Sequence, residues 1–566
     1  MRHERLFLCA GVSKPKQVGY PAKTKIIPLQ LLGRGANITL KISDIQQKLV
    51  ANLPELYTDL LEIATYVYCA DQAAPRGGSG ARDRGAKWRR NMYFVVPVRK
   101  PDFWSNQKVK NVLETLLHFL SDDNYDFRFT ELQHPPRVDA YFEFPGEEIG
   151  FQADDILSFS GGPDSLGGAI QETFVDGRRI ALVSHRSAPK IAPKQKRLHA
   201  EICNRCPQDV KPMHIPVWIQ KHGGEARDNS QLTRSFLYAS LSATIASMFG
   251  KDKIRFYENG ITSLNLPICE QVLGARATRT THAQSVSGFR ELFSLVNDRD
   301  FEVETPFLWK TKTDVVELIR NAGQADLMKH AVSCSRIWQM TRLKTHCGCC
   351  SQCIDRRLAV FASDCVEHDP DEMYKTDVFI GQRSEETQDV VLAESYIRSM
   401  RECSEMTESQ FFSKYGELAR VVPYIKGKSD DVAGKLFRLF LHNSTQVKNA
   451  IAKAVRYYAD QLVDEVLPNR CLLRQLFGTK TPRVEVQLPG DELVTLTRVA
   501  DLLNVDKGTV SRYADRGVIL DNGLKGLERR VWKSSVLLLK QQREDQELLR
   551  DAQELRKDSQ KLPNKH

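Results

Sequence analysis

The fold is decided by a glycine-rich stretch that reads Ser158-Phe159-Ser160-Gly161-Gly162-Pro163-Asp164-Ser165. A short apolar run, 155–159, precedes it, and apolar residues at helical spacing follow it, so it is predicted to join a strand to a helix. Two glycines let the backbone approach a ligand closely, and the N–H groups of a helix N-terminus favour an anion. The stretch is therefore interpreted as a phosphate cradle.

The side chains of this loop fit the same interpretation. Ser160 and Ser165 supply hydroxyl donors, and Asp164 can accept from the loop or help to hold Mg²⁺. The stretch lacks the Gly-Lys-Ser/Thr of a Walker loop and is not the dinucleotide G-x-G-x-x-G. The alternative is a tight turn with a helix cap.

Around the loop, strands and helices alternate. Apolar runs at 180–184 and 254–257 predict further strands, and a long helical stretch is expected at 232–249. Such alternation predicts an α/β fold with a parallel sheet and helices on both faces.

A second cluster consists of cysteines. Five of the thirteen cysteines fall between residues 334 and 353, and three of them form C-x₂-C-x₂-C. Four thiolates with this spacing can close a tetrahedral zinc site without an open position, which predicts a structural metal. The expected ligands are Cys334, Cys347, Cys350 and Cys353. Cys349 is expected to point away. His346 could be a substitute ligand, but an ordinary loop histidine is the favoured interpretation. An iron–sulfur cluster is the alternative metal group.

Length and hydropathy limit the classes of protein to which the chain can belong. The chain has 566 residues, enough for several domains. No apolar run approaches the ~20 residues of a membrane span, and no signal-peptide core is present, so a cytoplasmic protein is expected. The expected domains are an N-terminal α/β domain, a core with the loop and cysteines, a helical region and a small C-terminal unit, at 1–150, 151–375, 376–485 and 486–566.

Lys and Arg exceed Asp and Glu by ten, which allows a polyanionic partner. Two segments concentrate the basic residues. The first is a loop that could grip phosphates or be solvated, with Arg82, Arg84, Lys87, Arg89 and Arg90. The second, 178–199, contains seven Lys or Arg and no acidic residue, and the same two interpretations stay open for it.

The C-terminal unit has helix-turn-helix spacing over 496–513, with Thr497 or Thr495 as the cap of the first helix. Segments 517–519 and 529–532 suggest a wing, so a winged helix-turn-helix similar to the excisionase and MerR-like families is expected. Asp501, Asp506 and Asp515 interrupt its basic residues, so protein docking is favoured over DNA contact.

The loop and the cysteines together make the chain resemble the 7-cyano-7-deazaguanine synthase (QueC) family. That family joins an S-G-G-x-D-S loop to a late S-C…C-G-x-C-x-x-C-x-x-R signature, which here begins at Ser333 and ends at Arg356. Arg234-Ser235 and Thr305-Pro306 with Lys312 match further landmarks. The resemblance covers about residues 153–365 and implies the parallel-sheet fold of the N-type ATP pyrophosphatases (adenine nucleotide alpha hydrolase-like).

The resemblance also implies a reaction. The enzymes of the family are ATP-dependent ligases that adenylate the carboxylate of 7-carboxy-7-deazaguanine, form an amide with ammonia and dehydrate it to a nitrile. The implied cofactors are ATP, Mg²⁺ and Zn²⁺. The expected catalytic residues are Asp164, Ser165 and Lys312. The expected nucleotide-binding residues are Ser158, Phe159, Ser160, Gly161, Gly162, Asp164, Ser165 and Arg234.

Two segments depart from the family, Ser184-His185-Arg186-Ser187 after the second strand and the stretch 277–282, so a different acceptor pocket is expected. The N-terminal region resembles that of QueC-like proteins in bacterial antiphage gene clusters. This implies partner proteins encoded nearby, and a protein or nucleic-acid acceptor in place of ammonia. The alternatives are a nucleic-acid-binding regulator with a nucleotide-sensing pocket and a tRNA-modifying ATP pyrophosphatase.

Overall fold

A computed structural model gives the fold of the chain. The residues it describes are 3–13, 19–21, 23–43, 45, 49–50, 53–76, 88–143, 150–186, 189–223, 231–268, 279–383, 389–477, 492–515, 519, 529–533, 536–537 and 539–540. The chain divides into two compact units, Met1–Arg474 and Gln475–His566, which are described separately.

The first unit contains two sheets. The smaller one has the order β2-β1-β4-β5, and all its strands are parallel. Its strands are β1 (His3–Cys9), β2 (Lys25–Leu29), β4 (Arg90–Val98) and β5 (Asn124–Glu131). Side chains alternate along β5, where Tyr125, Phe127 and Phe129 are buried and their neighbours face outward. This alternation is that of a sheet with one covered face.

The larger sheet has the order β10-β9-β6-β7-β8-β3. Its strands are β3 (Ile38–Ile42), β6 (Asp155–Ser158), β7 (Ile180–His185), β8 (Met213–Lys221), β9 (Lys253–Arg255) and β10 (Glu302–Glu304). Only the β3–β8 pair is antiparallel. The prediction of a mixed α/β fold with a parallel sheet is confirmed. Strand β3 belongs to the first 150 residues yet completes this sheet, while the predicted domain boundaries stay predictions.

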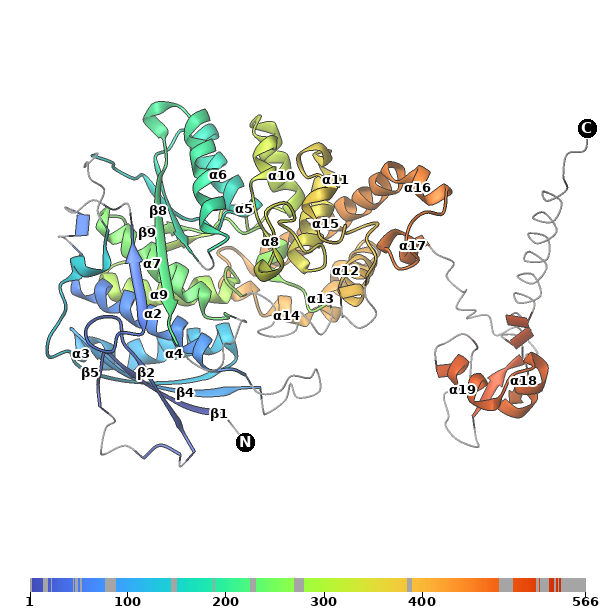
Figure 1. Cartoon of the computed structure of the whole chain (residues 1–566), viewed down its shortest axis with the longest axis horizontal. Coiled ribbons are helices and arrows are strands. Elements are labelled where there is room, and N and C mark those ends of the chain that lie inside the picture. The colour runs from blue at the N-terminus through green and yellow to red at the C-terminus, as the bar shows by residue number, and fades with distance from the viewer. Residues whose placement is uncertain are drawn as a thin grey trace, which may run out of the picture. The chain divides into compact units, whose positions relative to one another are not determined.

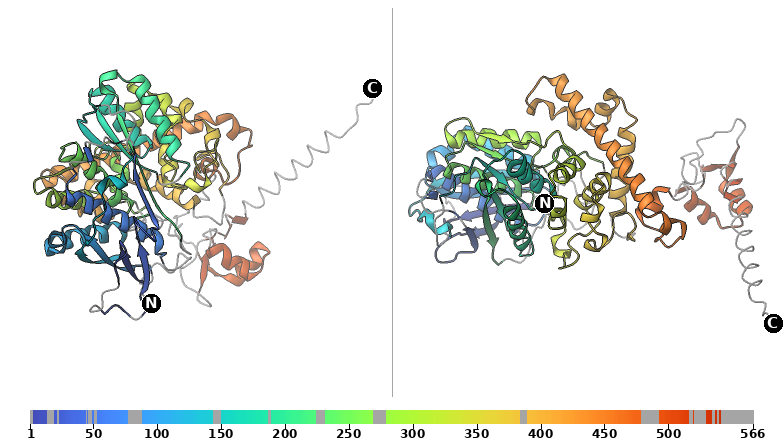
Figure 2. Two further views of the ribbon diagram at one scale, coloured as in Figure 1. Left: turned by 60° about the vertical axis from the view of Figure 1, so that its left-hand side comes forward. Right: turned by 90° about the horizontal axis from the view of Figure 1, so that it is seen from above.

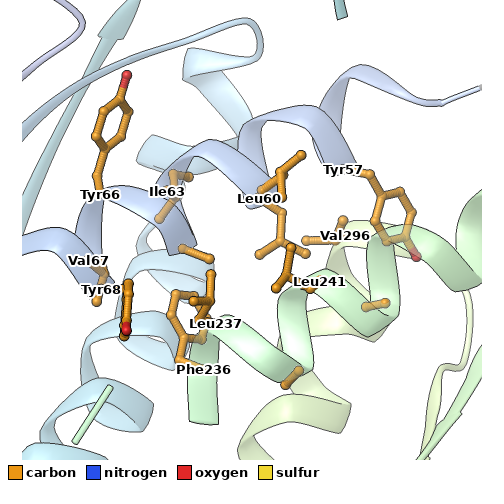
Figure 3. Packing of buried hydrophobic residues seen from close by; sticks show 14 of the residues in the cluster. Tyr57, Leu60, Ile63, Tyr66, Val67, Tyr68, Phe236, Leu237, Leu241 and Val296 are labelled. Atoms are coloured by element: carbon orange, nitrogen blue, oxygen red, sulfur yellow. The ribbon is translucent and has the colours of Figure 1, made fainter. Parts of the chain in front are cut away.

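A layer of helices lies between the two sheets (Figure 1). Its helices are α2 (Glu55–Ala73), α4 (Gln107–Ser121), α7 (Arg234–Met248) and α9 (Ala283–Asn297). Helix α2 packs on α7 and α4 packs on α9, so the residues of both sheets share one core. Figure 3 shows Leu60 of α2 facing Leu241 of α7. Every residue of α2 from Tyr57 to Asp71 is buried, as expected for a helix enclosed on all sides.

The opposite face of the larger sheet carries α5 (Pro163–Ile170), α6 (Ala192–Arg205) and α10 (Lys312–Asn321), which share a second core. Residues 389–474 add further helices. The long helix α15 (Ser429–Tyr457) packs against α11 (Ser351–Ala362) and α12 (Asp389–Cys403) (Figure 2). The described helices include none that is long and apolar enough to cross a membrane.

The second unit contains α18 (Leu496–Leu503) and α19 (Lys507–Asp515) beside an antiparallel pair of short strands, β11 (Leu493–Thr495) and β12 (Arg530–Trp532). Thr495 caps α18, since its hydroxyl accepts a hydrogen bond from the Arg498 amide at 3.4 Å. Val499, Val510 and Val531 meet in a small core. The winged helix-turn-helix stays a prediction, and the charged tail 541–566 lies outside the described residues.

Candidate nucleotide site and four-cysteine cluster

The candidate nucleotide site lies where the order of the larger sheet reverses. Strands β6, β7 and β8 succeed one another to one side of β6, and β9 returns to the other side of it. The carboxyl ends of β6 and β9 therefore flank a switch point, the place where open α/β sheets bind their ligands. The glycine-rich loop follows β6, and Glu258 and Asn259 follow β9.

The loop is held in shape by hydrogen bonds of its own. Ser165 Oγ accepts from the Gly161 amide at 3.1 Å and donates to the Gly162 carbonyl at 3.0 Å. Gly161 has φ +84°, and a Cβ at this position would lie 3.1 Å from Gln195 Cγ. Glycine is therefore required both by the backbone conformation and by the contact. Ser160 Oγ lies 3.2 Å from Ser165 Oγ, which places both predicted hydroxyls together at the start of α5.

The first two residues of the quoted stretch are oriented differently. Ser158 Oγ lies 2.9 Å from Ser242 Oγ of α7, and the Phe159 ring is fully buried in the core. Their side chains therefore contribute to packing on either side of the sheet. Only the backbone of these two residues remains for a nucleotide.

Asp164 and Lys312 meet across the loop, although 148 residues separate them. Lys312 Nζ lies 2.6 Å from Asp164 Oδ2, and both side chains are almost fully buried. Asn259 Nδ2 donates to the same oxygen at 3.0 Å. The other oxygen, Oδ1, is buried and has no partner among the described residues. A buried carboxylate oxygen that lacks a donor fits a cation such as Mg²⁺.

Two further carboxyl groups were missed by the sequence reasoning. Burial raises the pKa of Glu258, which accepts a hydrogen bond from Thr281 Oγ1 at 2.6 Å. Burial also raises the pKa of Asp355 to about 6, and its Oδ1 lacks a partner among the described residues. The charges of Lys312 and Asp164 act on both groups, so these carboxyl groups belong to the same site. The position of Glu258 just after a parallel strand was a signal that could have indicated it.

Arg234 is the first residue of α7, and its side chain is exposed. Its charge acts on Glu258 of the nucleotide site and on Tyr68 and His185. Arg234 therefore lies at the rim that connects these groups. Its assignment as a phosphate ligand stays a prediction.

The four predicted cysteines, Cys334, Cys347, Cys350 and Cys353, form one buried cluster, and their Sγ atoms all lie within 4.8 Å of one another. The Sγ of Cys353 lies 3.4 Å from that of Cys350 and 3.9 Å from that of Cys347. Tetrahedral zinc with Zn–S bonds of 2.3 Å separates its sulfur ligands by about 3.8 Å, so the cluster fits this ion. Cys349 is half-buried and stands outside the cluster, as predicted.

Local geometry explains why a glycine follows Cys347. Gly348 has φ +77°, and a Cβ there would lie 1.5 Å from the Thr376 carbonyl oxygen. The ring of His346 is buried, and its Nδ1 contacts Thr345 Oγ1 at 2.9 Å. His346 is not part of the cluster in the described residues, so its role as a substitute ligand is not supported.

Buried arginines hold the cluster against the core. Arg356, the last residue of the expected signature, donates to Asp369 at 2.8 Å and to the carbonyls of Ala331 and Met328, just before Cys334. Burial alone would raise the pKa of Asp369, but Arg356 and Arg357 keep it below its usual range. The Val332 amide donates to the Gly161 carbonyl at 2.8 Å. The segment before Cys334 thus joins the cluster to the glycine-rich loop.

Residues 225–363 match the family model described as Queuosine biosynthesis protein QueC. The matched stretch includes Arg234, Glu258, Lys312 and the whole cysteine cluster, and the glycine-rich loop lies upstream of it. A search of curated proteins finds no match to the chain. The chain therefore contains a QueC-like domain over residues 225–363.

Proposed function

We propose that this QueC-like chain uses ATP to activate a carboxylate by adenylation, with a 7-carboxy-7-deazaguanine-type molecule as the substrate. One observation carries the proposal: the loop 160–165 at the sheet's switch point, with the buried Asp164–Lys312 pair across it. An anion-binding loop beside a partly unpaired carboxylate and a lysine is what transfer of AMP from a Mg²⁺-bound nucleotide requires. The implied fold is that of the N-type ATP pyrophosphatases.

The residue roles follow from the positions of the groups. The Gly161 and Gly162 backbone and the Ser160 and Ser165 hydroxyls bind the pyrophosphate portion of ATP. Asp164 Oδ1 would hold Mg²⁺, which supplies charge neutralisation when bound. Lys312 Nζ neutralises negative charge on the phosphates. Arg234 binds phosphate or carboxylate at the rim.

The proposed reaction has two steps, adenylation of the carboxylate and attack by an amine, and neither step needs an oxidant or a reductant. A carboxylate oxygen attacks the α-phosphorus of ATP, the bond from this phosphorus to the bridging oxygen breaks, and pyrophosphate leaves with the bonding electrons. An amine nitrogen then attacks the acyl carbon, AMP leaves, and the nitrogen loses a proton. Ammonia gives an amide, which a second ATP can convert to a nitrile, and a macromolecular amine gives a conjugate. The protein accelerates these steps by positioning and by stabilising the phosphate charge.

The cysteine cluster has a structural role in this proposal. Four sulfur ligands leave no open position on Zn²⁺, so the metal would fix the segment that contacts Gly161 rather than take part in the chemistry. The flanking regions direct the enzyme to its partners, in a bacterial antiphage defence system, through the N-terminal region and a C-terminal winged helix-turn-helix.

The test is pyrophosphate release from ATP by the full chain with 7-carboxy-7-deazaguanine. The wild type should release pyrophosphate only when the carboxylate is present, and Asp164→Ala should reduce the rate by at least about 100-fold. A wild-type chain that releases no pyrophosphate with this carboxylate would contradict the proposal. It would favour a nucleotide-sensing role.

A further inference from the structure

An aromatic cluster lies beside the nucleotide site, and two of its members, Tyr68 and His185, come from outside the segment that matches the QueC model. Tyr68 of α2 points toward α7, next to Phe236 (Figure 3). Its ring packs edge-on against His185, with ring centroids 5.1 Å apart and planes at 90°. Tyr238 of α7 packs against the other side of His185 at 5.8 Å. His185 is the last residue of β7, the strand adjacent to β6.

Two polar atoms of this cluster are buried without a hydrogen bond. The Tyr68 hydroxyl has no partner among the described residues, and the Ile219 backbone carbonyl can accept a hydrogen bond from only one of the two ring nitrogens of His185. Each such buried group costs free energy, and native proteins keep few of them. Two such atoms side by side at the carboxyl edge of a parallel sheet point to a ligand that completes their hydrogen bonds.

The protonation state of His185 limits the chemistry of this ligand. Burial lowers the pKa of His185 to about 3, and the charge of Arg234 acts in the same direction. The neutral imidazole presents one donor and one acceptor, and the Tyr68 hydroxyl can do either. These groups match the edge of a flat heteroaromatic ring, in which N–H and C=O groups alternate. They do not match a phosphate, which would need several donors.

Arg234 connects this cluster to the reacting phosphates. Its charge acts on Tyr68, on His185 and on Glu258, and its side chain is exposed at the N-terminus of the 15-residue helix α7. A guanidinium at this position can hold a carboxylate between the aromatic cluster and the glycine-rich loop.

We propose that Tyr68, His185 and Arg234 form the pocket for the molecule whose carboxylate is activated. Tyr68 and His185 bind the edge of its heteroaromatic ring, and Arg234 binds its carboxylate. The inference rests on the proposed function and goes beyond it, because it assigns one wall of the substrate pocket to the N-terminal region. The adenine of ATP has the same flat heteroaromatic chemistry, so the experiment must distinguish the two molecules.

Calorimetric titration of the full chain with 7-carboxy-7-deazaguanine, and separately with α,β-methylene-ATP, makes this distinction. Tyr68→Phe removes only the hydroxyl and should weaken binding of the carboxylate about tenfold, the usual effect of one lost hydrogen bond. It should leave binding of the ATP analogue unchanged. The control is Tyr66→Phe on the same helix, whose ring points away from Tyr68 (Figure 3); both affinities should stay at the wild-type value.

Thermal unfolding of the free chain gives a second readout. Tyr68→Phe should not lower Tm, because the hydroxyl that it removes has no partner among the described residues. A lower Tm with unchanged carboxylate affinity would show a purely structural role and overturn the inference. Weaker binding of the ATP analogue would assign the pocket to adenine and also overturn it. A wild-type chain that releases pyrophosphate, with an unchanged KM for the carboxylate in Tyr68→Phe, would refute the pocket and leave the proposed function standing.

Discussion

Asp71 is the residue whose replacement tests the junction between the N-terminal region and the QueC domain most directly. Its carboxylate is fully buried at the end of α2. Oδ1 lies 2.5 Å from Arg90 Nη2 and 3.7 Å from Arg76, and Oδ2 accepts hydrogen bonds from the Thr233 amide and hydroxyl, both at 3.1 Å. Thr233 is the N-cap residue of α7. One side chain thus neutralises a buried arginine and fixes the start of the helix that carries Arg234.

The magnitude of the Asp71→Ala effect follows from these contacts. Removing one partner of a buried ion pair costs about 3–5 kcal/mol, and loss of a buried hydrogen bond costs about 1 kcal/mol. Asp123 stays in place and still pairs with Arg90 at 2.6 Å, which reduces the first cost. We therefore expect Asp71→Ala to lower the free energy of unfolding by about 3–5 kcal/mol. Asp71→Asn keeps an acceptor for Thr233 and should cost less.

Urea denaturation followed by circular dichroism measures this change, with the slope compared between variants to check that the transition is the same. The matched control is Asp139→Ala, which removes an exposed pair with Arg137 at 2.6 Å and should change the free energy of unfolding by less than about 0.5 kcal/mol. An Asp71→Ala loss below about 1 kcal/mol would refute the reasoning, because a buried arginine cannot lose one of its two carboxylate partners at so small a cost.

Three further predictions concern metal, pH and packing. Elemental analysis should find one zinc per chain in the wild type and in Cys349→Ser, and a loss of metal in Cys353→Ser; equal metal content in both variants would contradict the four-cysteine site. Burial alone would raise the pKa of Asp71, but Arg90 and Arg76 hold it below its usual value, so its contribution to stability is present above about pH 4 and is lost as the pH falls through the folded-state pKa. Acid titration of the unfolding free energy should therefore be flatter below about pH 4 in Asp71→Asn than in the wild type, and identical slopes would argue against the pairing. A Cβ on Gly260 would lie 1.9 Å from the Leu308 carbonyl oxygen, so Gly260→Ala should destabilise the chain by at least about 2 kcal/mol, whereas Gly150→Ala, with no atom within 4 Å, should be neutral in the same urea assay.

The parts of the site that depend on local spacing could be predicted from the sequence. The loop 160–165 and the four cysteines are each fixed by residues close in the chain, and the cysteines meet as expected. Lys312 was expected in the site only from the resemblance, and the structure brings its side chain to Asp164. Asp355 reaches the same site only through tertiary folding, whereas Glu258 could have been indicated by its position just after a parallel strand.

In the basic loop near residue 90, the sequence suggested a functional role for a residue that has a structural one. Arg90 was grouped with cations that could grip phosphates, but it is fully buried and pairs with Asp71 and Asp123. Composition records the charge of Arg90 but not its partners, which lie 19 and 33 residues away. Arg82, Arg84 and Lys87 lie outside the described residues. The strand at 38–42 was also missed, because its partner β8 is far away in the chain.

Strand β3 limits where the chain can be cut to obtain a soluble fragment. β3 covers the edge of β8, and α2 covers a face of α7, so cutting the chain near residue 150 would bare both an unpaired strand edge and an apolar helix face. Such surfaces lead to aggregation. An excised QueC domain should therefore be insoluble on its own. In this chain, the residues before 225, where the match to the family model begins, cannot be separated from those that follow without exposing the apolar face of α7.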